Sequence, residues 1–448
     1  MKNKSKRKDL TKGNLEKQIL FMTLPMILGM LGMVIFNFVD ALYIGKLGET
    51  ELAAIAFTFP VVLVIQSISQ GLSMGTGSVV SKFAGEKNED WVKKTSTYSL
   101  VLSFSIVVVF SIIGHLTIEP LFKLLGATSN EMPYIKSYMR IWYFGMPFVV
   151  IPMVGNNIIR ALGDTKIPSL VMTIAAVLNM ILDPILIFGW GFEGLGIAGA
   201  AIATVFARFI TFSAAIYILT KREKVLSFKD VHFKEFLCSC KSVLYIAVPT
   251  SITRGVIPIG MGIITALIAT FGALDVAGYG AGVKIENLGM SVVNALSVVM
   301  VAVTGQNFGA KNFDRVKSGY KIACSYSLLY SFIIIPIFFF TAPLLSKLFD
   351  VIQPVRDVII IYVRLAVLGI GFFGVLNISS ALLNAVRKPI IATLLFLFEM
   401  FGLYIPSAFI FSKMFGTQGV FYGLIIAYVI SGIISYIVTT KIINKNLA

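Results

Sequence analysis

The sequence predicts an all-α integral membrane protein, with twelve transmembrane helices in two six-helix bundles related by a parallel repeat. Three observations lead to this fold class. Hydrophobic residues make up 57% of the 448-residue chain and charged residues 13%, with a mean hydropathy of +0.88. The apolar residues form long runs with few charges, and the second half of the chain repeats features of the first. A soluble domain carries about 25% charged residues, so this composition excludes an ordinary soluble protein.

Twelve apolar runs are each long enough to cross a bilayer as a helix, which takes about 20 residues. In chain order they span residues 18–43, 52–81, 95–118, 133–159, 167–189, 196–220, 243–272, 277–308, 320–343, 357–386, 389–412 and 418–440. The even number of crossings places both termini on the same side of the membrane.

Lysine and arginine are distributed unequally between the two sides of this predicted membrane. If the N-terminus is cytoplasmic, 27 of the 38 basic residues fall in cytoplasmic segments and seven in outer segments. Cytoplasmic loops of membrane proteins carry such an excess. The net charge of +16 therefore reflects topology, and we expect no nucleic-acid partner. We predict a multi-pass protein of the cell membrane with both termini in the cytoplasm.

Two pairs of segments, about half a chain length apart, resemble each other. The first pair is KFAGEKNEDWVKK at 82–94 and NFGAKNFDRVKS at 307–318. The second is NNIIRALGDTKIP at 156–168 and LNAVRKPI at 383–390, which places Arg160 opposite Arg387. Since six crossings make each half, both halves have the same orientation, which is a parallel repeat. Two equal bundles with a cleft between them favour a transporter.

The repeat also predicts the domain organisation. We expect an N-terminal six-helix lobe at 1–220, a cytoplasmic linker at 221–242 and a C-terminal six-helix lobe at 243–448. Pro25 and Pro249 lie early in the first and seventh runs at the same offset. A proline bends a helix, so Pro25 is a candidate hinge; the alternative is a static packing kink.

Acidic side chains are rare within the apolar runs, and two of them lie at a similar depth in the first half. Asp40 follows Asn37 by three residues and Asp183 follows Asn179 by four, so each acid shares a helix face with an amide. Both acids come shortly before the outer end of their runs. Thr204 lies at a similar depth in the sixth run, because a helix rises about 1.5 Å per residue.

These carboxylate, amide and hydroxyl oxygens predict a site for cation or proton coupling. Oxygen ligands suit a hard cation, so Na⁺ is a candidate ligand of Asp40, Asn179, Asp183 and Thr204, with Asn37 beside them. A buried pair of carboxyl groups can instead hold a proton. The alternative is that both acids only form hydrogen bonds to neighbours within the first bundle.

Further polar residues are candidates for lining a substrate cleft between the bundles. The set comprises Asn156 and Asn157 from the first half and Arg254, Lys284 and Glu286 from the second. The alternative for each is ordinary polar packing within its own bundle. Glu399 stands alone in its apolar run, and we assign it no role.

No catalytic motif is found in the sequence. HExxH and P-loop patterns are absent, and no cluster of acids or histidines marks a membrane face. The small residues of GLSMGTGSVV at 71–80 indicate close helix packing. We therefore expect no enzyme and no cofactor other than the coupling ion, H⁺ or Na⁺.

Three stretches together carry a resemblance to a known family: LPMILGMLGMVIFNFVDALYIGKLG, NNIIRALGDTKIP and NMILDPILIFGWGFEGLGIAGAAIAT. Over essentially its whole length the chain resembles the multidrug and toxic compound extrusion (MATE) transporters. The resemblance implies twelve helices in two lobes, and export of amphipathic, often cationic compounds driven by inward Na⁺ or H⁺ flow. Carried over, Asp40, Asn179, Asp183 and Thr204 match the first-lobe cation site.

The resemblance fails at one point in the second half. Many members of the family have an acid on the seventh helix, whereas this chain reads VPTSITRGVIP, with Arg254 and no acid. We therefore expect the coupling site to lie in the first lobe.

The expected function is secondary active antiport that exports amphipathic, cationic drugs or metabolites in exchange for H⁺ or Na⁺ by alternating access. A flippase for a lipid-linked precursor is the alternative, because the wider superfamily includes such proteins. The expected partners are a small amphipathic organic substrate and the lipid bilayer, and we expect a monomer.

Overall fold

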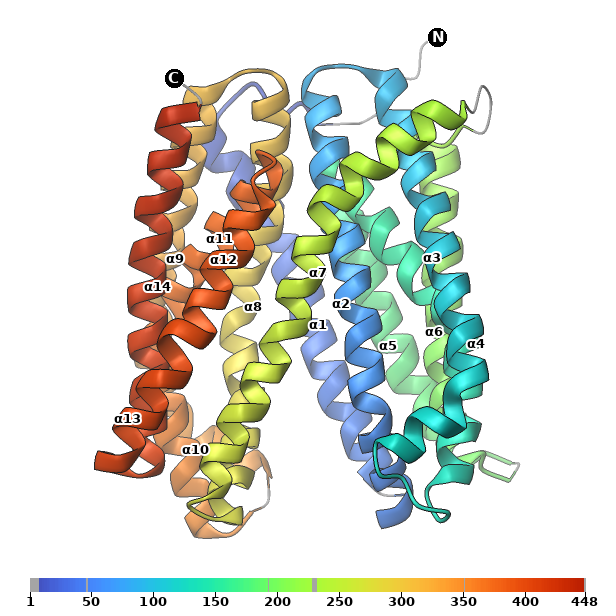
Figure 1. The fold of residues 1–448 in the computed structure, drawn as a ribbon, viewed down its shortest axis with the longest axis vertical. Coiled ribbons are helices and arrows are strands. Elements are labelled where there is room, and N and C mark those ends of the chain that lie inside the picture. The colour runs from blue at the N-terminus through green and yellow to red at the C-terminus, as the bar shows by residue number, and fades with distance from the viewer. Residues whose placement is uncertain (1–7, 46, 192, 228–231, 350, 447–448) are drawn as a thin grey trace. The chain divides into compact units, whose positions relative to one another are not determined.

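The computed structural model describes residues 8–45, 47–191, 193–227, 232–349 and 351–446. Within the helices, the side chains at 37, 38, 40–42, 44, 45, 49 and 446 lie outside this description. All regular elements of the described residues are helical (Figure 1).

Six long helices form the first half of the chain: α1 (Leu15–Gly45), α2 (Glu49–Gly85), α3 (Glu89–Leu124), α4 (Met132–Ala161), α5 (Lys166–Phe188) and α6 (Gly196–Tyr217), which a π-helical turn, η1 (Ile218–Arg222), extends. The second half comprises α7 (Phe233–Ala269), α8 (Ala273–Gly309), α9 (Phe313–Ser346), η2 (Lys347–Phe349), α10 (Gln353–Ala366), η3 (Val367–Gly369), α11 (Ile370–Ala385), α12 (Pro389–Leu397), η4 (Phe398–Tyr404), α13 (Ile405–Phe415) and α14 (Thr417–Asn446).

Twelve segments of the described chain are long enough and apolar enough to cross a membrane, as predicted. Two of them in the second half each combine three helices. The segment Gln353–Ala385 contains α10, η3 and α11, and the segment Pro389–Phe415 contains α12, η4 and α13. In the second of these, the α-helix changes to a π-helix at Phe398 and returns to an α-helix at Ile405.

The chain forms two compact units whose boundaries fall inside helices. The first unit contains Leu28–Ser251, and the second contains Asp9–Ile27 together with the chain from Ile252 onward. Helices α1 and α7 therefore each pass from one unit into the other. In both helices the change comes two residues after a proline, Pro25 in α1 and Pro249 in α7.

These units differ from the predicted lobes at 1–220 and 243–448, and the predicted linker at 221–242 overlaps the first turns of α7. Contacts of the exchanged segments explain the difference. In the first unit, α7 packs closely on α2: a Cβ added at Gly71 would lie 2.4 Å from the carbonyl oxygen of Ala247, and one at Gly75 2.5 Å from that of Val243. Only glycine permits this approach.

The segment that precedes α1 is tied to the second unit by hydrogen bonds. Leu10 donates its backbone N–H to Oε1 of Gln306 over 3.0 Å, and its carbonyl oxygen accepts from Nδ2 of Asn307 over 3.1 Å. Arg315 donates from Nη1 to the carbonyl oxygen of Gly13 over 2.9 Å. These polar contacts hold the start of α1 on the ends of α8 and α9.

The internal repeat is visible in the backbone of the turns. Gly48 and Gly272, which precede α2 and α8, have φ angles of 151° and 149°, and Lys87 and Lys311, which follow the same helices, have φ angles of 56° and 58°. Both pairs are 224 residues apart. The predicted parallel repeat is thus a repeat of structure, turn by turn.

A third turn corrects the alignment of the second repeated pair of segments. Gly163, after α4, has a φ of 88°, and Arg387, after α11, has a φ of 62°. They are also 224 residues apart, and α4 and α11 end at the same offset, at Ala161 and Ala385. Arg387 therefore corresponds to Gly163 and not to Arg160, because the deletion in the second half falls after this turn.

Candidate functional site

The first candidate site is built on α5, whose start is fixed by polar contacts. Asp164 accepts hydrogen bonds at Oδ1 from the backbone N–H of Lys166 and of Ile167, at 3.0 and 3.3 Å. Its other oxygen accepts from Nη2 of Arg222 over 2.8 Å, which connects the start of α5 to η1. Helix α5 ends at Phe188 and is followed by Gly189, whose φ of 82° is natural for glycine.

Helices α5 and α6 approach each other closely at a small residue. A Cβ added at Gly199 of α6 would lie 2.3 Å from the carbonyl oxygen of Leu186 on α5. This approach brings the two candidate polar positions together: Nδ2 of Asn179 lies 3.4 Å from Oγ1 of Thr204. The amide donates and the hydroxyl accepts.

Asp183 lies one turn after Asn179 on the same face of α5, and both side chains are buried, at 0% and 3% exposed. Oδ1 of Asn179 accepts no hydrogen bond from the described residues. Pro184 follows Asp183 and has no N–H to donate to the carbonyl of Met180, one turn earlier. Carboxylate, amide and carbonyl oxygens are thus concentrated in this part of α5.

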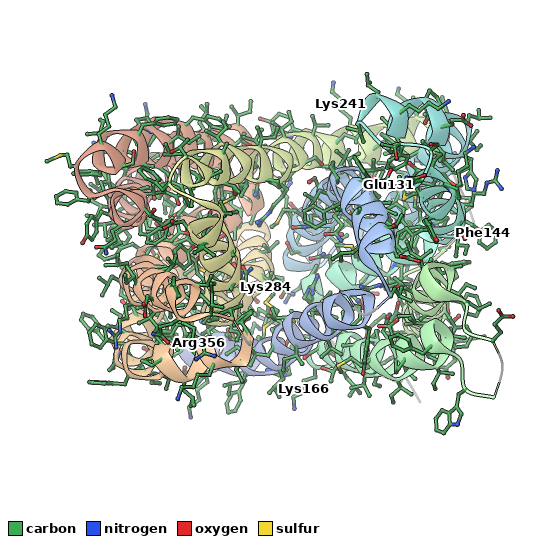
Figure 2. All side chains as sticks on the ribbon, turned by 90° about the horizontal axis from the view of Figure 1, so that it is seen from below. Glu131, Phe144, Lys166, Lys241, Lys284 and Arg356 are labelled. Atoms are coloured by element: carbon green, nitrogen blue, oxygen red, sulfur yellow. The ribbon has the colours of Figure 1, made fainter. Side chains whose placement is uncertain are left out.

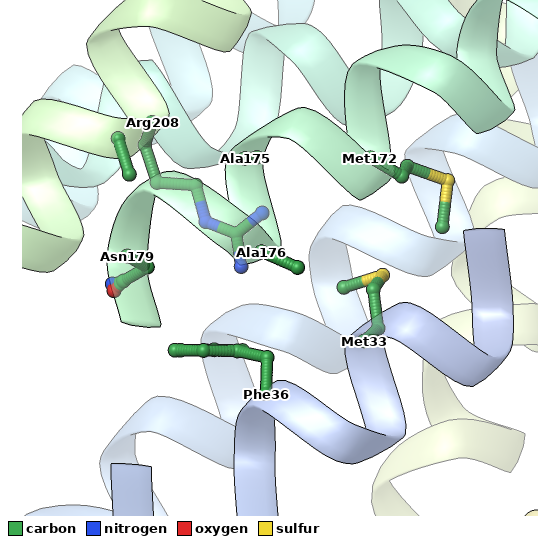
Figure 3. A pocket seen from close by; sticks show the side chains of 8 residues that line it. Met33, Phe36, Met172, Ala175, Ala176, Asn179 and Arg208 are labelled. Atoms are coloured by element: carbon green, nitrogen blue, oxygen red, sulfur yellow. The ribbon is translucent and has the colours of Figure 1, made fainter. Parts of the chain in front are cut away.

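Asn37 and Asp40 belong to α1, but their side chains lie outside the described residues, so their part in the site stays a prediction. Met33 and Phe36 line a pocket of the first unit together with residues of α5 and α6 (Figure 3).

Arg208 lines the same pocket, and we missed its relevance in the sequence. The other lining residues are Met33, Phe36, Met172, Ala175, Ala176, Asn179 and Ala207. Figure 3 shows the guanidinium of Arg208 reaching past Ala176 into the pocket. It forms no ion pair or hydrogen bond with the side chains that the structure describes. Its spacing of four residues from Thr204 was the available signal, since it predicts a shared helix face.

The two asparagines predicted for the cleft lie on α4, in the first unit. Asn156 is buried, and its Oδ1 has no hydrogen-bond partner among the described residues. Asn157 donates from Nδ2 to the carbonyl oxygen of Met153 over 3.1 Å and faces Gly77 of α2.

The three other residues predicted for the cleft lie in the second unit, in different surroundings. Arg254 is half-buried on α7, and Lys284 is exposed on α8 (Figure 2). Glu286 is buried at 7% exposed and accepts hydrogen bonds from Tyr362 and Tyr428. A common cleft lined by residues of both units stays a prediction.

Pro25, the predicted hinge, is half-buried in a helix that continues from Leu15 to Gly45. Its position two residues before the change of units is consistent with a hinge, which also stays a prediction. Among the described residues, no three His, Cys, Asp or Glu side chains gather as a metal site would require. Carboxylate and amide oxygens are ligands of hard cations, and coupling of H⁺ or Na⁺ at α5 stays a prediction.

Comparison with known proteins relates both halves of the chain to one family. Residues 25–185 and 249–410 each match the MatE family model. The chain is 33% identical over 438 residues to the FAD transporter of Shewanella oneidensis, with 97% of each chain covered. It is 26% identical over 421 residues to the probable multidrug resistance protein YoeA of Bacillus subtilis, covering 92% of this chain and 90% of the relative.

The fold is shared with solved transporters. The crystal structure of the Vibrio cholerae MATE transporter VcmN in the bent form matches with a TM-score of 0.89 and 27% identity, covering 96% of this chain and 97% of that chain. These relatives are transporters and not enzymes. Three observations support the same assignment: the twelve membrane-crossing segments, the repeat of two six-helix halves, and the family match over both halves. The chain is a multi-pass membrane transporter and belongs to the MATE family.

Proposed function

We propose that this protein exports a small amphipathic compound in exchange for H⁺ or Na⁺, which enters through Asp183, Asn179 and Thr204. The supporting observation is the contact between Asn179 and Thr204, with the fully buried Asp183 one turn away. A buried carboxylate is costly unless a cation, a proton or hydrogen bonds compensate its charge. A coupling cation that binds and then leaves compensates the charge only in the cation-bound state of the transporter.

Exchange requires that the cation weakens substrate binding and that the substrate weakens cation binding. Reciprocal linkage means that a cation which weakens substrate binding is itself displaced by the substrate. A cation at Asp183 contacts α5 and α6, and Asp40 would add α1. Since α1 changes units just after Pro25, movement of α1 is a route from the site to the rest of the transporter. We further propose a monomer in the cell membrane with both termini in the cytoplasm.

The test is export by the full-length protein in vesicles, with the Na⁺ and pH gradients imposed separately. Wild type should respond to one of the two gradients, and Asp183→Asn should respond to neither. The matched control is Asp357→Asn, an exposed aspartate of α10 whose partner is Gln353. Wild-type export that is indifferent to both gradients, or full coupling in Asp183→Asn, would contradict the proposal.

Two substrate classes are supported by different observations. Amphipathic organic cations are suggested by the multidrug relatives. A phosphate-bearing dinucleotide such as FAD is suggested by the FAD transporter relative and by Arg208, because a guanidinium binds phosphate oxygens in pairs. The second class therefore stands as a second candidate.

Arg208→Gln separates the two classes. If the substrate is a dinucleotide, FAD export should fall at least tenfold in this variant, while the control Arg140→Gln, an exposed arginine of α4, should retain it. If the substrate is an organic cation, ethidium export should persist in Arg208→Gln. FAD export by wild type that Arg208→Gln leaves unchanged would remove the support that Arg208 gives to the dinucleotide.

A further inference from the structure

Among the described residues, four that are not glycine have a positive φ, and all four are basic. They are Lys87 at 56°, Lys224 at 51°, Lys311 at 58° and Arg387 at 62°. A Cβ crowds the backbone in this left-handed region, so glycine is the residue that it favours. Each of the four is exposed, and none forms an ion pair or a side-chain hydrogen bond with the residues that the structure describes.

All four residues occupy the same place, two residues after the last residue of a helix. The helices are α2, η1, α8 and α11 in that order. The residue after Lys311 donates its N–H to the carbonyl oxygen of Asn307 over 2.8 Å, and the residue after Arg387 donates to that of Leu383 over 2.7 Å. This is the bond of the Schellman motif, which closes a helix with a left-handed residue. The basic side chain therefore stands at the tip of the turn.

The side of the membrane determines which residue type takes this position. In the proposed topology, α2, η1, α8 and α11 end at the cytoplasmic face, whereas α3, α5 and α13 end at the outer face. After these outer ends the positive φ belongs to Gly126, Gly189 and Gly416, at 97°, 82° and 58°. The dipole of a helix attracts a basic residue to its C-terminus equally on both sides. The helix dipole therefore does not explain the difference.

Direction of loops to the cytoplasm does not explain the position either. An excess of Lys and Arg acts in this way wherever those residues stand in the loop. The turn after α4 is also cytoplasmic in the proposed topology, yet it has Gly163, with a φ of 88°. A Cβ there would lie 2.7 Å from the carbonyl oxygen of Lys8. Glycine is thus found where the protein's own backbone covers the turn, and a basic residue where the tip is exposed.

Aromatic side chains beside two of these turns are typical of the membrane interface. Phe83 and Trp91 flank Lys87 in the sequence and stack on each other, with ring centroids 5.4 Å apart. Phe308 and Phe313 flank Lys311 in the same way, with centroids 6.2 Å apart. All four rings are half-buried, and aromatic side chains concentrate at the level of the lipid headgroups. The basic tips are therefore within reach of lipid phosphates.

We propose that Lys87 and Lys224 in the first unit, and Lys311 and Arg387 in the second, bind the headgroups of anionic phospholipids in the cytoplasmic leaflet. Their charges have no counter-ion among the described residues, and the phosphate oxygens of an anionic lipid supply one. Each unit is thereby held to the leaflet at two turns. The proposal rests on the proposed orientation and is independent of the substrate and of the coupling ion.

Thermal unfolding of the full-length protein in lipid nanodiscs tests the proposal without any transport. Replacing part of the phosphatidylcholine by phosphatidylglycerol should raise the melting temperature of wild type. The combined variant Lys87→Gly, Lys224→Gly, Lys311→Gly and Arg387→Gly should lose most of this rise. In pure phosphatidylcholine it should melt close to wild type, because glycine suits the left-handed turns, and this shows that it folds. A melting temperature lowered equally in both lipids would overturn the proposal, since the charges would then act within the protein alone.

A matched control removes the same number of charges from exposed lysines inside helices of the same face. It combines Lys17→Gln, Lys234→Gln, Lys321→Gln and Lys441→Gln. This control should keep the rise with phosphatidylglycerol. Equal loss in the control and in the glycine variant would show a diffuse attraction to the whole basic face, and it would overturn the assignment to the four turns.

Native mass spectrometry measures the bound lipid directly. Wild type should retain phosphatidylglycerol in preference to phosphatidylcholine. Lys87→Gly with Lys224→Gly, and separately Lys311→Gly with Arg387→Gly, should each lose part of the bound phosphatidylglycerol. Inorganic phosphate added to phosphatidylcholine nanodiscs should not raise the melting temperature of wild type. A rise equal to that with phosphatidylglycerol would indicate a soluble anion in place of a lipid and would overturn the proposal.

Discussion

Asn179 and Thr204 lie on different helices, yet Nδ2 of one is 3.4 Å from Oγ1 of the other. This contact links α5 to α6 beside Asp183, which has no exposed surface. If the proposed cation binds here, with ligands from both helices, it would stabilise one arrangement of α5 and α6 over another. Changes at this contact should therefore alter cation affinity before they alter folding.

The hydroxyl of Thr204 is the first element to test. Thr204→Val keeps the shape and removes the acceptor for Asn179, which costs about 1 kcal/mol for one hydrogen bond, or about fivefold in affinity. We expect the affinity for the coupling ion, measured from the ion dependence of export, to be about fivefold lower in Thr204→Val and near normal in Thr204→Ser. Equal behaviour of the two variants would exclude a role for the hydroxyl.

Asp40 is predicted to be essential for coupling. Asp40→Asn keeps the size and loses the charge that binds a cation or releases a proton. Gradient-driven export should be lost at normal membrane level, whereas substrate counterflow, which needs no net cation movement, should continue. Export at the wild-type rate by Asp40→Asn would remove Asp40 from the mechanism.

Gly199 is predicted to be required for the approach of α5 and α6. A methyl group at this position would lie 2.3 Å from the carbonyl oxygen of Leu186, so the helices must separate. Gly199→Ala should destabilise the protein by about 1–3 kcal/mol, as overpacking does, and should weaken coupling as well. Gly262→Ala, where nothing lies within 4 Å of the added group, is the control. Equal melting temperatures for the two variants would contradict this packing.

The orientation in the membrane can be checked by labelling. Asp90 and Asp314 are exposed and lie at corresponding starts of α3 and α9, and Glu193 is exposed in the connection before α6. In a background without Cys238, Cys240 and Cys324, a cysteine at 90 or 314 should react only from the cytoplasm. A cysteine at 193 should react only from outside. Labelling of position 90 from outside would reverse the proposed topology.

Several features of this protein were available from sequence patterns alone. The twelve spans follow from hydropathy, because each apolar run must satisfy its backbone hydrogen bonds as a helix in lipid. The repeat was visible in the sequence where corresponding turns of the two halves carry the same residue type, as at Lys87 and Lys311. Asn179 and Thr204 were paired by depth, and the structure brings them into contact.

Other features depend on contacts between distant segments. The apolar runs could not predict that α1 and α7 pass from one unit into the other. Hydropathy shows where a helix lies in the chain, but it does not show which helices pack against each part of it. The alignment of Arg160 with Arg387 was wrong for a related reason. It matched two identical residue types, whereas the positive φ angles of Gly163 and Arg387, which show the true correspondence, are visible only in the structure.

The sequence by itself determined the class of the protein, the number of its spans and the position of its acids along them, since these depend on local composition. The tertiary structure decided which acids have partners. Glu286 was one candidate among several in its run, but folding brings its carboxyl group to the hydroxyls of Tyr362 on α10 and Tyr428 on α14. Burial and neighbouring charge determine what a carboxyl group can do, and both arise only when helices far apart in the chain pack together.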